Sequence, residues 1–161
     1  MYKRQDWGTA YAKSQMAAQP ALPTAGKVFI SVRDSDKTPV IAIARELITL
    51  GFEICASAGT AKTLRDAGLT VQPLFKLQEG RPNCLDLIKN NELAMIINTP
   101  AGKTPRVDEV KIRTAAVQHK ISIMTTLASG KAAVAGIKAL RAQGLTVQSI
   151  QEYHRELNKC A

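Results

Sequence analysis

The sequence has few cysteines, and their placement excludes two classes of protein. The chain holds three cysteines in 161 residues, at the separated positions Cys55, Cys84 and Cys160. They form neither a CxxC pair nor a Cys/His cluster, so neither a zinc site nor a disulfide framework is expected. Cys55 falls in an apolar run and is expected to be a small core residue. This usage of cysteine is typical of a reducing cytoplasm.

Long apolar segments are also absent. No run approaches the roughly 20 residues that are needed to cross a bilayer. Lys3 and Arg4 lie near the N-terminus, but no apolar segment follows them as it would in a secretory signal. We therefore expect a cytoplasmic protein with no membrane partner.

Aromatic residues are scarce, and the positive charge is dispersed. Aromatic side chains make up 4% of the sequence, which leaves few platforms on which bases could stack. The formal net charge of +9 comes from basic residues spread along the sequence rather than gathered in one run. We expect a field that attracts anionic ligands, and no nucleic-acid partner.

Common catalytic motifs are missing too. The sequence contains no GxxxxGK[ST] loop, no GxGxxG turn and no GxSxG elbow. His119 and His154 fall on or just after predicted helices, where a surface position is expected. Asp36 is interpreted as a helix cap and Asp34 as a solvated loop residue, so no carboxylate pair is placed for acid–base catalysis. We expect neither catalytic machinery nor a bound cofactor or metal in this chain.

What the sequence does contain is an alternation of apolar runs and helical patterns. Strands are expected at 27–32, 53–56, 70–74, 94–98 and 121–124, with a weaker candidate at 146–149. Helices are expected at 37–50, 60–67, 82–90, 105–118, 126–143 and 149–158. One of these helices carries four residues on a single face, namely Val107, Val110, Thr114 and Val117. Continuous apolar strands interleaved with helices predict a single three-layer α/β/α domain around a five-stranded parallel sheet.

A further helix is expected before this alternation begins. Residues 8–18 have good helix propensity, and Pro20 and Pro23 then break the pattern. The expected organisation is therefore an N-terminal helix and linker at 1–26, followed by the α/β domain at 27–161.

Polar residues follow several of the predicted strands. Ser57-Ala58-Gly59-Thr60 reads as a strand end, a tight turn and a helix start, which places free backbone N–H groups where an anion such as phosphate can bind. Because the carboxyl ends of parallel strands meet at one edge of a sheet, we expect one crevice there. Its candidate residues are Lys37, Ser57, Thr60, Lys76, Asn98, Thr99 and Thr125. The predicted ligand is a phosphorylated small molecule.

The order of these motifs resembles a known regulatory domain. The matching residues are Ser31 to Lys37, Gly51 to Glu53, Ser57 to Thr60, Ala67-Gly68, Lys76, Glu79 to Pro82, Ile96 to Thr99, and Thr125 to Leu127. Together they resemble the C-terminal, methylglyoxal-synthase-like domain of the carbamoyl phosphate synthase large subunit. The resemblance runs from about Asp6 to the end of the sequence.

The resemblance implies an allosteric module of an ATP-dependent, glutamine-using ligase, with catalysis in the preceding regions. The implied effector is UMP, or IMP as in some members, and the implied pathways are pyrimidine and arginine biosynthesis. The implied partners are the catalytic region of the same large subunit and, through it, the glutaminase small subunit. Whether the chain also forms a homo-oligomer stays open at this level. This chain would then be an excised piece of a longer protein.

The resemblance also implies residue roles. Lys37, Ser57, Thr60 and Lys76 would hold the phosphate, and Asn98 would meet the ribose with Thr99 beside it. Two departures alter the expected control. Pro100 stands where the enterobacterial pattern of the family has a threonine, so one ribose contact of that pattern is not matched. Ile123 stands where a tyrosine is associated with ornithine activation, so we expect nucleotide control at this site and no ornithine control through Thr125.

Other functions remain open at this level. A methylglyoxal-synthase-type lyase shares the fold, but its catalytic aspartates are not matched at Asn98-Thr99-Pro100. The IMP cyclohydrolase domain of the bifunctional purine enzyme shares the early motifs but not the match after Lys76. An N-acetylglutamate-binding synthase and a pure assembly module are further alternatives. The two lysines that suit a phosphate, Lys37 and Lys76, favour a nucleotide.

Overall fold

The computed structural model describes residues 7–18, 20–100, 107–143, 151 and 155. Its strands are β1 (Lys27–Ser31), β2 (Glu53–Ser57), β3 (Gln72–Leu74), β4 (Leu93–Asn98) and β5 (Ser122–Met124). Its helices are α1 (Trp7–Ala18), α2 (Lys37–Thr49), α3 (Ala58–Asp66), α4 (Cys84–Lys89), α5 (Val107–Gln118) and α6 (Leu127–Gln143), and a 3-10 turn η1 (Asp34–Asp36) precedes α2. The predicted strand at 146–149 and nearly all of the predicted helix at 149–158 lie outside the described residues.

The strands form one parallel, five-stranded sheet in the order β3-β2-β1-β4-β5. In the register of this sheet, Phe29 of the central strand lies beside Cys55 of β2 and Ile96 of β4. The backbone runs outward from β1 in one direction through β2 and β3, and then continues on the other side through β4 and β5. This reversal next to β1 is the place where parallel α/β sheets bind ligands.

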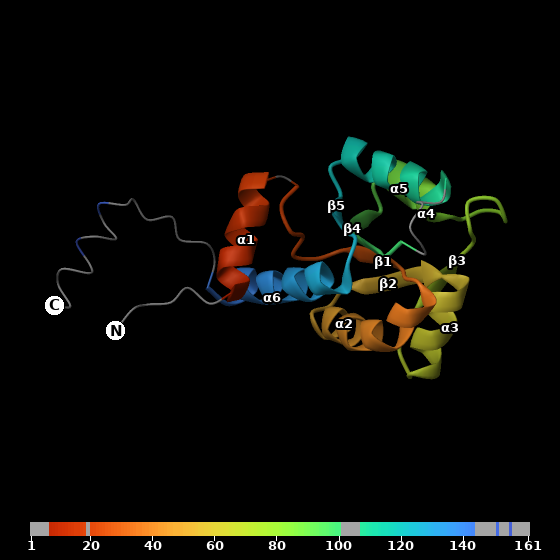
Figure 1. Cartoon of the computed structure of the whole chain (residues 1–161), viewed down its shortest axis with the longest axis horizontal. Helices are drawn as coiled ribbons and strands as arrows, with labels where there is room; N and C mark the ends of the chain where they lie inside the picture. Colours follow the sequence, from red (N-terminus) through yellow and green to blue (C-terminus); the bar gives the residue numbers. More distant parts are fainter. Residues whose placement is uncertain (1–6, 19, 101–106, 144–150, 152–154, 156–161) are drawn as a thin grey trace.

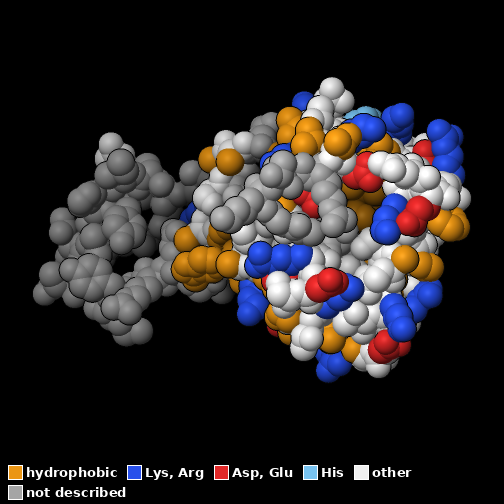
Figure 2. Space-filling view, turned by 45° about the vertical axis from the view of Figure 1, so that its right-hand side comes forward, with side chains coloured by type: hydrophobic (Ala, Val, Ile, Leu, Met, Phe, Trp, Pro, Cys, Tyr) orange, Lys and Arg blue, Asp and Glu red, His pale blue; other side chains and the backbone are white. Residues whose placement is uncertain are grey.

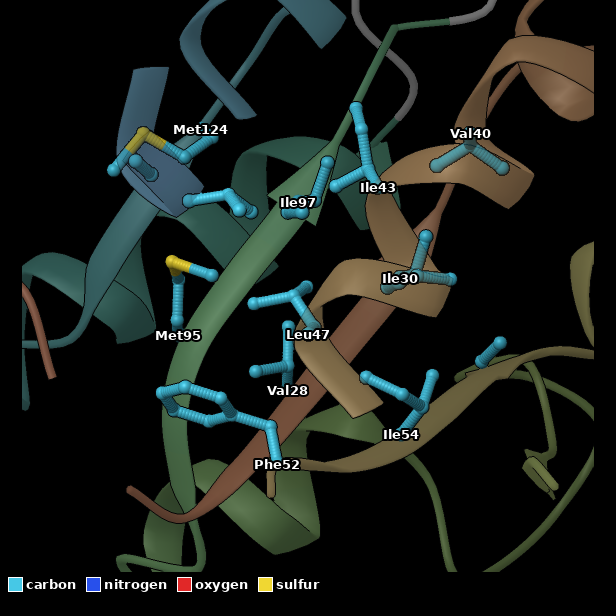
Figure 3. Close-up of a cluster of buried hydrophobic side chains, with 14 of the residues drawn as sticks. Val28, Ile30, Val40, Ile43, Leu47, Phe52, Ile54, Met95, Ile97 and Met124 are labelled. Carbon is cyan, nitrogen blue, oxygen red and sulfur yellow. The ribbon is translucent and has the colours of Figure 1, made fainter. Parts of the chain in front are cut away.

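Helices cover both faces of the sheet, as Figure 1 shows. Val28 and Ile30 of β1 join the buried cluster that includes residues of α2, α3 and α6, whereas Phe29 between them joins the cluster of α4 and α5. Figure 3 shows Ile43 and Leu47 of α2 packed over the first of these faces. Because each strand alternates between two apolar layers, its sequence is apolar throughout. The predicted three-layer α/β/α architecture is confirmed.

The N-terminal helix packs on α6 at a point of close approach. Ala12 of α1 is fully buried, and Leu22 of the following linker is also part of the core. Gly136 of α6 lies beneath them, and a Cβ at this glycine would fall 2.7 Å from Leu22 Cδ1 and 3.6 Å from Ala12 Cβ. The absence of a side chain at residue 136 therefore allows α1 and the linker to approach α6.

The helix starts differ from the sequence predictions. Helix α3 begins at Ala58, directly after β2, so no separate tight turn precedes it. Asp36 and Ser57 occupy the N-cap positions of α2 and α3, but neither side chain makes a capping hydrogen bond. A full capping box instead begins α4, where the Asn83 side chain accepts from the backbone and the Asp86 carboxylate accepts from Asn83 N–H.

Helix α5 packs through a different face from the one that its apolar spacing indicates. Ile112 and Ala116 are its buried residues. Val107, Val110, Thr114 and Val117, which share the predicted face, are all exposed.

Within the described residues, no helix has the length and hydropathy needed to cross a membrane.

Candidate functional site

A pocket of about 450 Å³ opens at the carboxyl ends of β1, β2 and β4. The structure brings together there almost all of the residues predicted from the sequence, namely Lys37, Ser57, Thr60, Lys76, Asn98 and Thr99. Thr125, by contrast, is not among the described residues that line it. Thr125 follows β5 at the edge of the sheet, whereas the pocket lies over the centre, so the structure does not bring this residue into the pocket.

On the face shown in Figure 2, Lys and Arg side chains are interspersed with Asp and Glu rather than gathered in one basic stripe. This distribution agrees with the dispersed basic residues of the sequence. The positive charge that matters for the pocket therefore has to come from the individual lysines that line it.

Lys37 is the first residue of α2, and its side chain lies over the start of α3. A Cβ at Gly59 would fall 3.2 Å from Lys37 Nζ and 3.7 Å from its Cε. The ammonium group therefore sits against the first turn of α3, where the backbone N–H groups are not used within the helix. Lys37 Nζ also contacts Asp34 Oδ1 at 2.7 Å. A cation and a helix N-terminus are thus directed at one point of the pocket wall.

A row of hydroxyl groups runs along the same wall. Ser31 Oγ donates to Ser57 Oγ, and Ser57 Oγ donates to Thr60 Oγ1, each at 3.2 Å. Thr60 Oγ1 also accepts from the backbone N–H of Val32 at 3.3 Å. Because the hydroxyl groups of Ser57 and Thr60 can each donate or accept, this row can turn a donor toward an anionic ligand. Ser31, at the end of β1, also lines the pocket.

Thr99 lines the pocket and also holds its framework together. Its hydroxyl oxygen accepts from Arg33 N–H at 3.1 Å, and the hydroxyl also bonds the carboxylate of Asp36. Asp36 is 8% exposed and accepts from Arg33 Nε at 3.0 Å. Burial raises the pKa of Asp36, but the hydrogen bonds from Thr99, Arg33 and Ser35 outweigh it and hold the pKa below its usual value. Asp36 therefore stays ionised and ties the ends of β1 and β4 to α2.

Asn98 ends β4 with its side chain at the pocket wall. It is 6% exposed and is one of the residues that line the pocket. A buried amide gains from a ligand that offers it both a donor and an acceptor. Hydroxyl groups of a sugar meet that requirement.

Lys76 also lines the pocket, from the segment after β3. Its Nζ contacts Glu79 Oε1 at 3.0 Å, and its backbone N–H donates to Glu79 Oε2 at 3.4 Å. The hydrogen bond from Lys76 is the largest cause of the lowered pKa of Glu79. Phe75 beside it is exposed and also lines the pocket.

The start of α5 contributes pocket residues that the sequence reasoning missed. Asp108, Glu109 and Ile112 line the pocket from the side of α5. Asp108 Oδ1 is buried and has no hydrogen-bond partner among the described residues. These residues lie at the start of a helix rather than at the end of a strand. The expectation that site residues follow the strands therefore could not identify them. Among the described residues no group of three or more His, Cys, Asp or Glu side chains is placed to hold a metal ion.

The remaining titratable candidates are structural. Cys55 and Cys84 are buried free thiols, as predicted for Cys55. Burial raises the pKa of Cys55 to about 12, and burial likewise raises the pKa of Cys84. His119 is exposed, as predicted, and its Nδ1 lies 3.2 Å from Asn91 Oδ1, outside the pocket lining. His154 lies outside the described residues.

The pocket falls largely within a segment that matches a known family. Residues 39–125, more than half of the sequence, match the model of the family described as MGS-like domain. Among solved structures, a methylglyoxal synthase from Elizabethkingia anophelis superposes with a TM-score of 0.57 at 13% sequence identity, covering 70% of this chain and 79% of that one. At this identity the likeness shows a shared fold.

Curated relatives match almost the whole sequence. The carbamoyl phosphate synthase large chain of Pseudomonas putida is 48% identical over 151 residues, which are 94% of this chain and 14% of that protein. In Methanopyrus kandleri, the C-terminal section of the same large chain is 44% identical over 150 residues, which are 92% of this sequence and 28% of that protein. The chain thus spans a small part of the length of these relatives. It belongs to the family of MGS-like domains, in the form found in the large chains of carbamoyl phosphate synthases.

Proposed function

We propose that this domain binds a nucleoside monophosphate, UMP or IMP, as an allosteric effector of a carbamoyl phosphate synthase. The observation that carries the proposal is the position of Lys37, whose ammonium lies over Gly59 at the start of α3 inside a pocket. A helix N-terminus combined with a lysine forms a site for phosphate. The pocket volume of about 450 Å³ lies in the range of small-molecule sites.

Each wall of the pocket has a role in this proposal. Lys37 and Lys76 supply positive charge for the phosphate, and the Thr60 hydroxyl supplies a donor. The Asn98 amide, which is buried at the end of β4, is available to the ribose hydroxyls. Thr99 acts indirectly, because its hydroxyl holds Asp36 and Arg33 N–H.

Helix α5 offers a route by which occupancy of the pocket reaches other domains. Asp108 and Ile112 line the pocket, while Val110 and Val117 on the same helix are exposed. A ligand that shifts α5 would therefore change a surface that faces away from the site. The receiving partners in this proposal are the catalytic region of the large subunit and, through it, the glutaminase small subunit. Regulation then requires that the two states of that enzyme bind the effector with different affinity.

Calorimetric titration tests the binding part of the proposal. The purified protein is titrated with UMP, with IMP, and with uridine, which lacks the phosphate. We expect saturable binding of UMP or IMP and a large loss of affinity for uridine. Equal affinity for UMP and uridine would contradict a phosphate site.

Enzyme kinetics test the route through α5. In a complete large subunit that carries this domain, Val110→Asp is expected to weaken inhibition by UMP while UMP still binds. Lys111→Ala, at the neighbouring exposed position of α5, is the matched control and should leave inhibition unchanged. Unaltered inhibition in Val110→Asp would remove this helix from the route.

One observation favours a second candidate, a phosphate-eliminating lyase. Asp108 places a buried carboxylate oxygen without a partner among the described residues at the wall of the pocket. A carboxylate beside a phosphate site is able to act as a general base. Incubation of the protein with dihydroxyacetone phosphate decides between the two functions, since the lyase releases inorganic phosphate and the effector domain does not.

A further inference from the structure

Both lysines of the pocket are already paired with a carboxylate from their own segment. Lys37 Nζ contacts Asp34 Oδ1 at 2.7 Å, and Lys76 Nζ contacts Glu79 Oε1 at 3.0 Å. In each pair the two residues are three apart in sequence. All four residues line the same pocket. The two charges that would bind a phosphate are therefore neutralised by the protein itself.

The pair at Lys37 is strongly asymmetric in its exposure. The Lys37 side chain is 29% exposed, whereas that of Asp34 is 95% exposed. The ammonium is fixed between η1 and the start of α3, where a Cβ at Gly59 would lie 3.2 Å from it. The carboxylate, in contrast, reaches the ammonium from the solvent side. Because the carboxylate side of this ion pair is exposed to solvent, an anion that enters the pocket can compete with it for the ammonium.

We propose, on the basis of the function proposed above, that Asp34 and Glu79 are internal competitors of the effector phosphate and set its affinity. A singly charged anion gains little by replacing a carboxylate of the same charge. A phosphate monoester carries about −1.5 to −2 charges at pH 7, so it gains more from each lysine than the carboxylate that it replaces. The two carboxylates thus keep the site closed to weak anions and lower its affinity for the effector to a regulated range.

The competition predicts an unusual sign for a mutation in a binding pocket. Asp34→Asn leaves Lys37 without its competitor and removes a negative charge that repels the bound phosphate. We expect UMP to bind roughly two- to fivefold more tightly, which corresponds to the loss of one exposed ion pair. Glu79→Gln changes the affinity in the same direction, through Lys76. If the carboxylate instead held the lysine in position for the phosphate, replacing it would weaken UMP binding.

Calorimetric titration of the complete protein with UMP and with uridine tests the proposal. The variants are Asp34→Asn, Glu79→Gln and Asp66→Asn, which is a matched control because Asp66 is exposed and is not among the residues that line the pocket. We expect tighter UMP binding in the first two variants and no change in the third. Uridine has no phosphate to compete, so its weaker affinity should be equal in all proteins.

The outcomes separate this inference from the function on which it rests. If the unmodified protein binds UMP and both pocket variants bind it equally or more weakly, the inference is overturned and the effector site stands. If neither UMP nor IMP binds to any of the proteins, the proposed function fails and the inference fails with it. The use of two variants on different segments guards against a folding defect in one of them.

Discussion

Arg33 Nε lies 3.0 Å from Asp36 Oδ2, and this pair connects the end of the central strand to the start of α2. The Asp36 carboxylate is almost fully buried and is also bonded by the Thr99 hydroxyl from the end of β4. Lys37 is the next residue in the sequence. The direction in which Lys37 enters the pocket is therefore fixed by a charge that does not itself face the ligand.

Replacing that charge should destabilise the fold. We expect Asp36→Asn to lower the free energy of unfolding by about 1–3 kcal/mol, the range for a charged hydrogen bond with a buried partner. Urea unfolding monitored by circular dichroism measures this loss. Asp66→Asn, on the exposed end of α3, serves as the control and should change stability by less than about 0.5 kcal/mol.

The same group predicts part of the pH dependence of stability. Because the pKa of Asp36 is lower in the folded state than its ordinary value, the stabilisation is present above about pH 4 and is lost as the pH falls below it. Asp36→Asn should therefore show a shallower loss of stability between neutral pH and pH 3 than the unmodified protein. If the free energy of unfolding fell with pH equally in the two proteins, the partners of Asp36 would not lower its pKa in the folded state.

Gly59→Ala should separate stability from binding. Alanine is the better helix former, so we expect the free energy of unfolding to rise by up to about 1 kcal/mol. The new Cβ would lie 3.2 Å from Lys37 Nζ and would push the ammonium away from the start of α3. UMP affinity should therefore fall while stability does not. Unchanged affinity on calorimetric titration would show that the ligand does not approach this turn.

Two glycines of α6 form a matched pair of tests for the docking of α1. A Cβ at Gly136 would lie 2.7 Å from Leu22 Cδ1, whereas one at Gly130 would lie at ordinary contact distances of 3.5 Å and 3.6 Å from Ile43 and Ile97. Each substitution replaces a glycine of the same helix by alanine, so the gain in helix propensity is the same for both. We expect Gly136→Ala to lower stability by about 1–3 kcal/mol through overpacking and Gly130→Ala to leave it equal or higher. Equal effects in urea unfolding would contradict the described packing of α1 and its linker on α6.

The buried thiols should be unreactive while the protein is folded. The raised pKa values of Cys55, to about 12, and of Cys84 leave almost no thiolate at pH 8. In a Cys160→Ser background, we expect Ellman's reagent to label neither thiol in buffer and both of them in urea. Rapid labelling of one thiol without urea would show that its cluster opens without global unfolding.

The sequence predicted the fold well because the strands are buried on both faces. Runs such as Met95-Ile96-Ile97 are continuous and apolar, and the helices between them end at recognisable glycines such as Gly51 and Gly68. Helix faces were harder to predict. The apolar spacing in α5 follows Val107 and Val117, yet the helix packs through Ile112 and Ala116. Periodicity identifies a helix, but it does not say which of two mixed faces meets the sheet.

The pocket was predictable where its residues follow strands. Lys37, Ser57 and Asn98 meet because β1, β2 and β4 are neighbours and parallel. Thr125 shows the limit of this reasoning, since the strand order that places β5 at an edge cannot be read from the sequence. The pairing of Asp34 with Lys37 had a signal in the spacing of three residues, whereas Asp108 had none. Whether these residues bind a nucleotide remains a prediction.

Titration of UMP into Lys37→Ala, with Lys62→Ala as the control, tests the central claim most directly. Lys62 is exposed on α3, one turn from Gly59 and outside the described lining of the pocket, so both variants lose one positive charge from neighbouring positions. We expect Lys37→Ala to weaken UMP binding by about 1.5–3 kcal/mol, the range for a charged hydrogen bond, and Lys62→Ala to change it little. Equal affinities in the two variants would contradict a phosphate site at the start of α3.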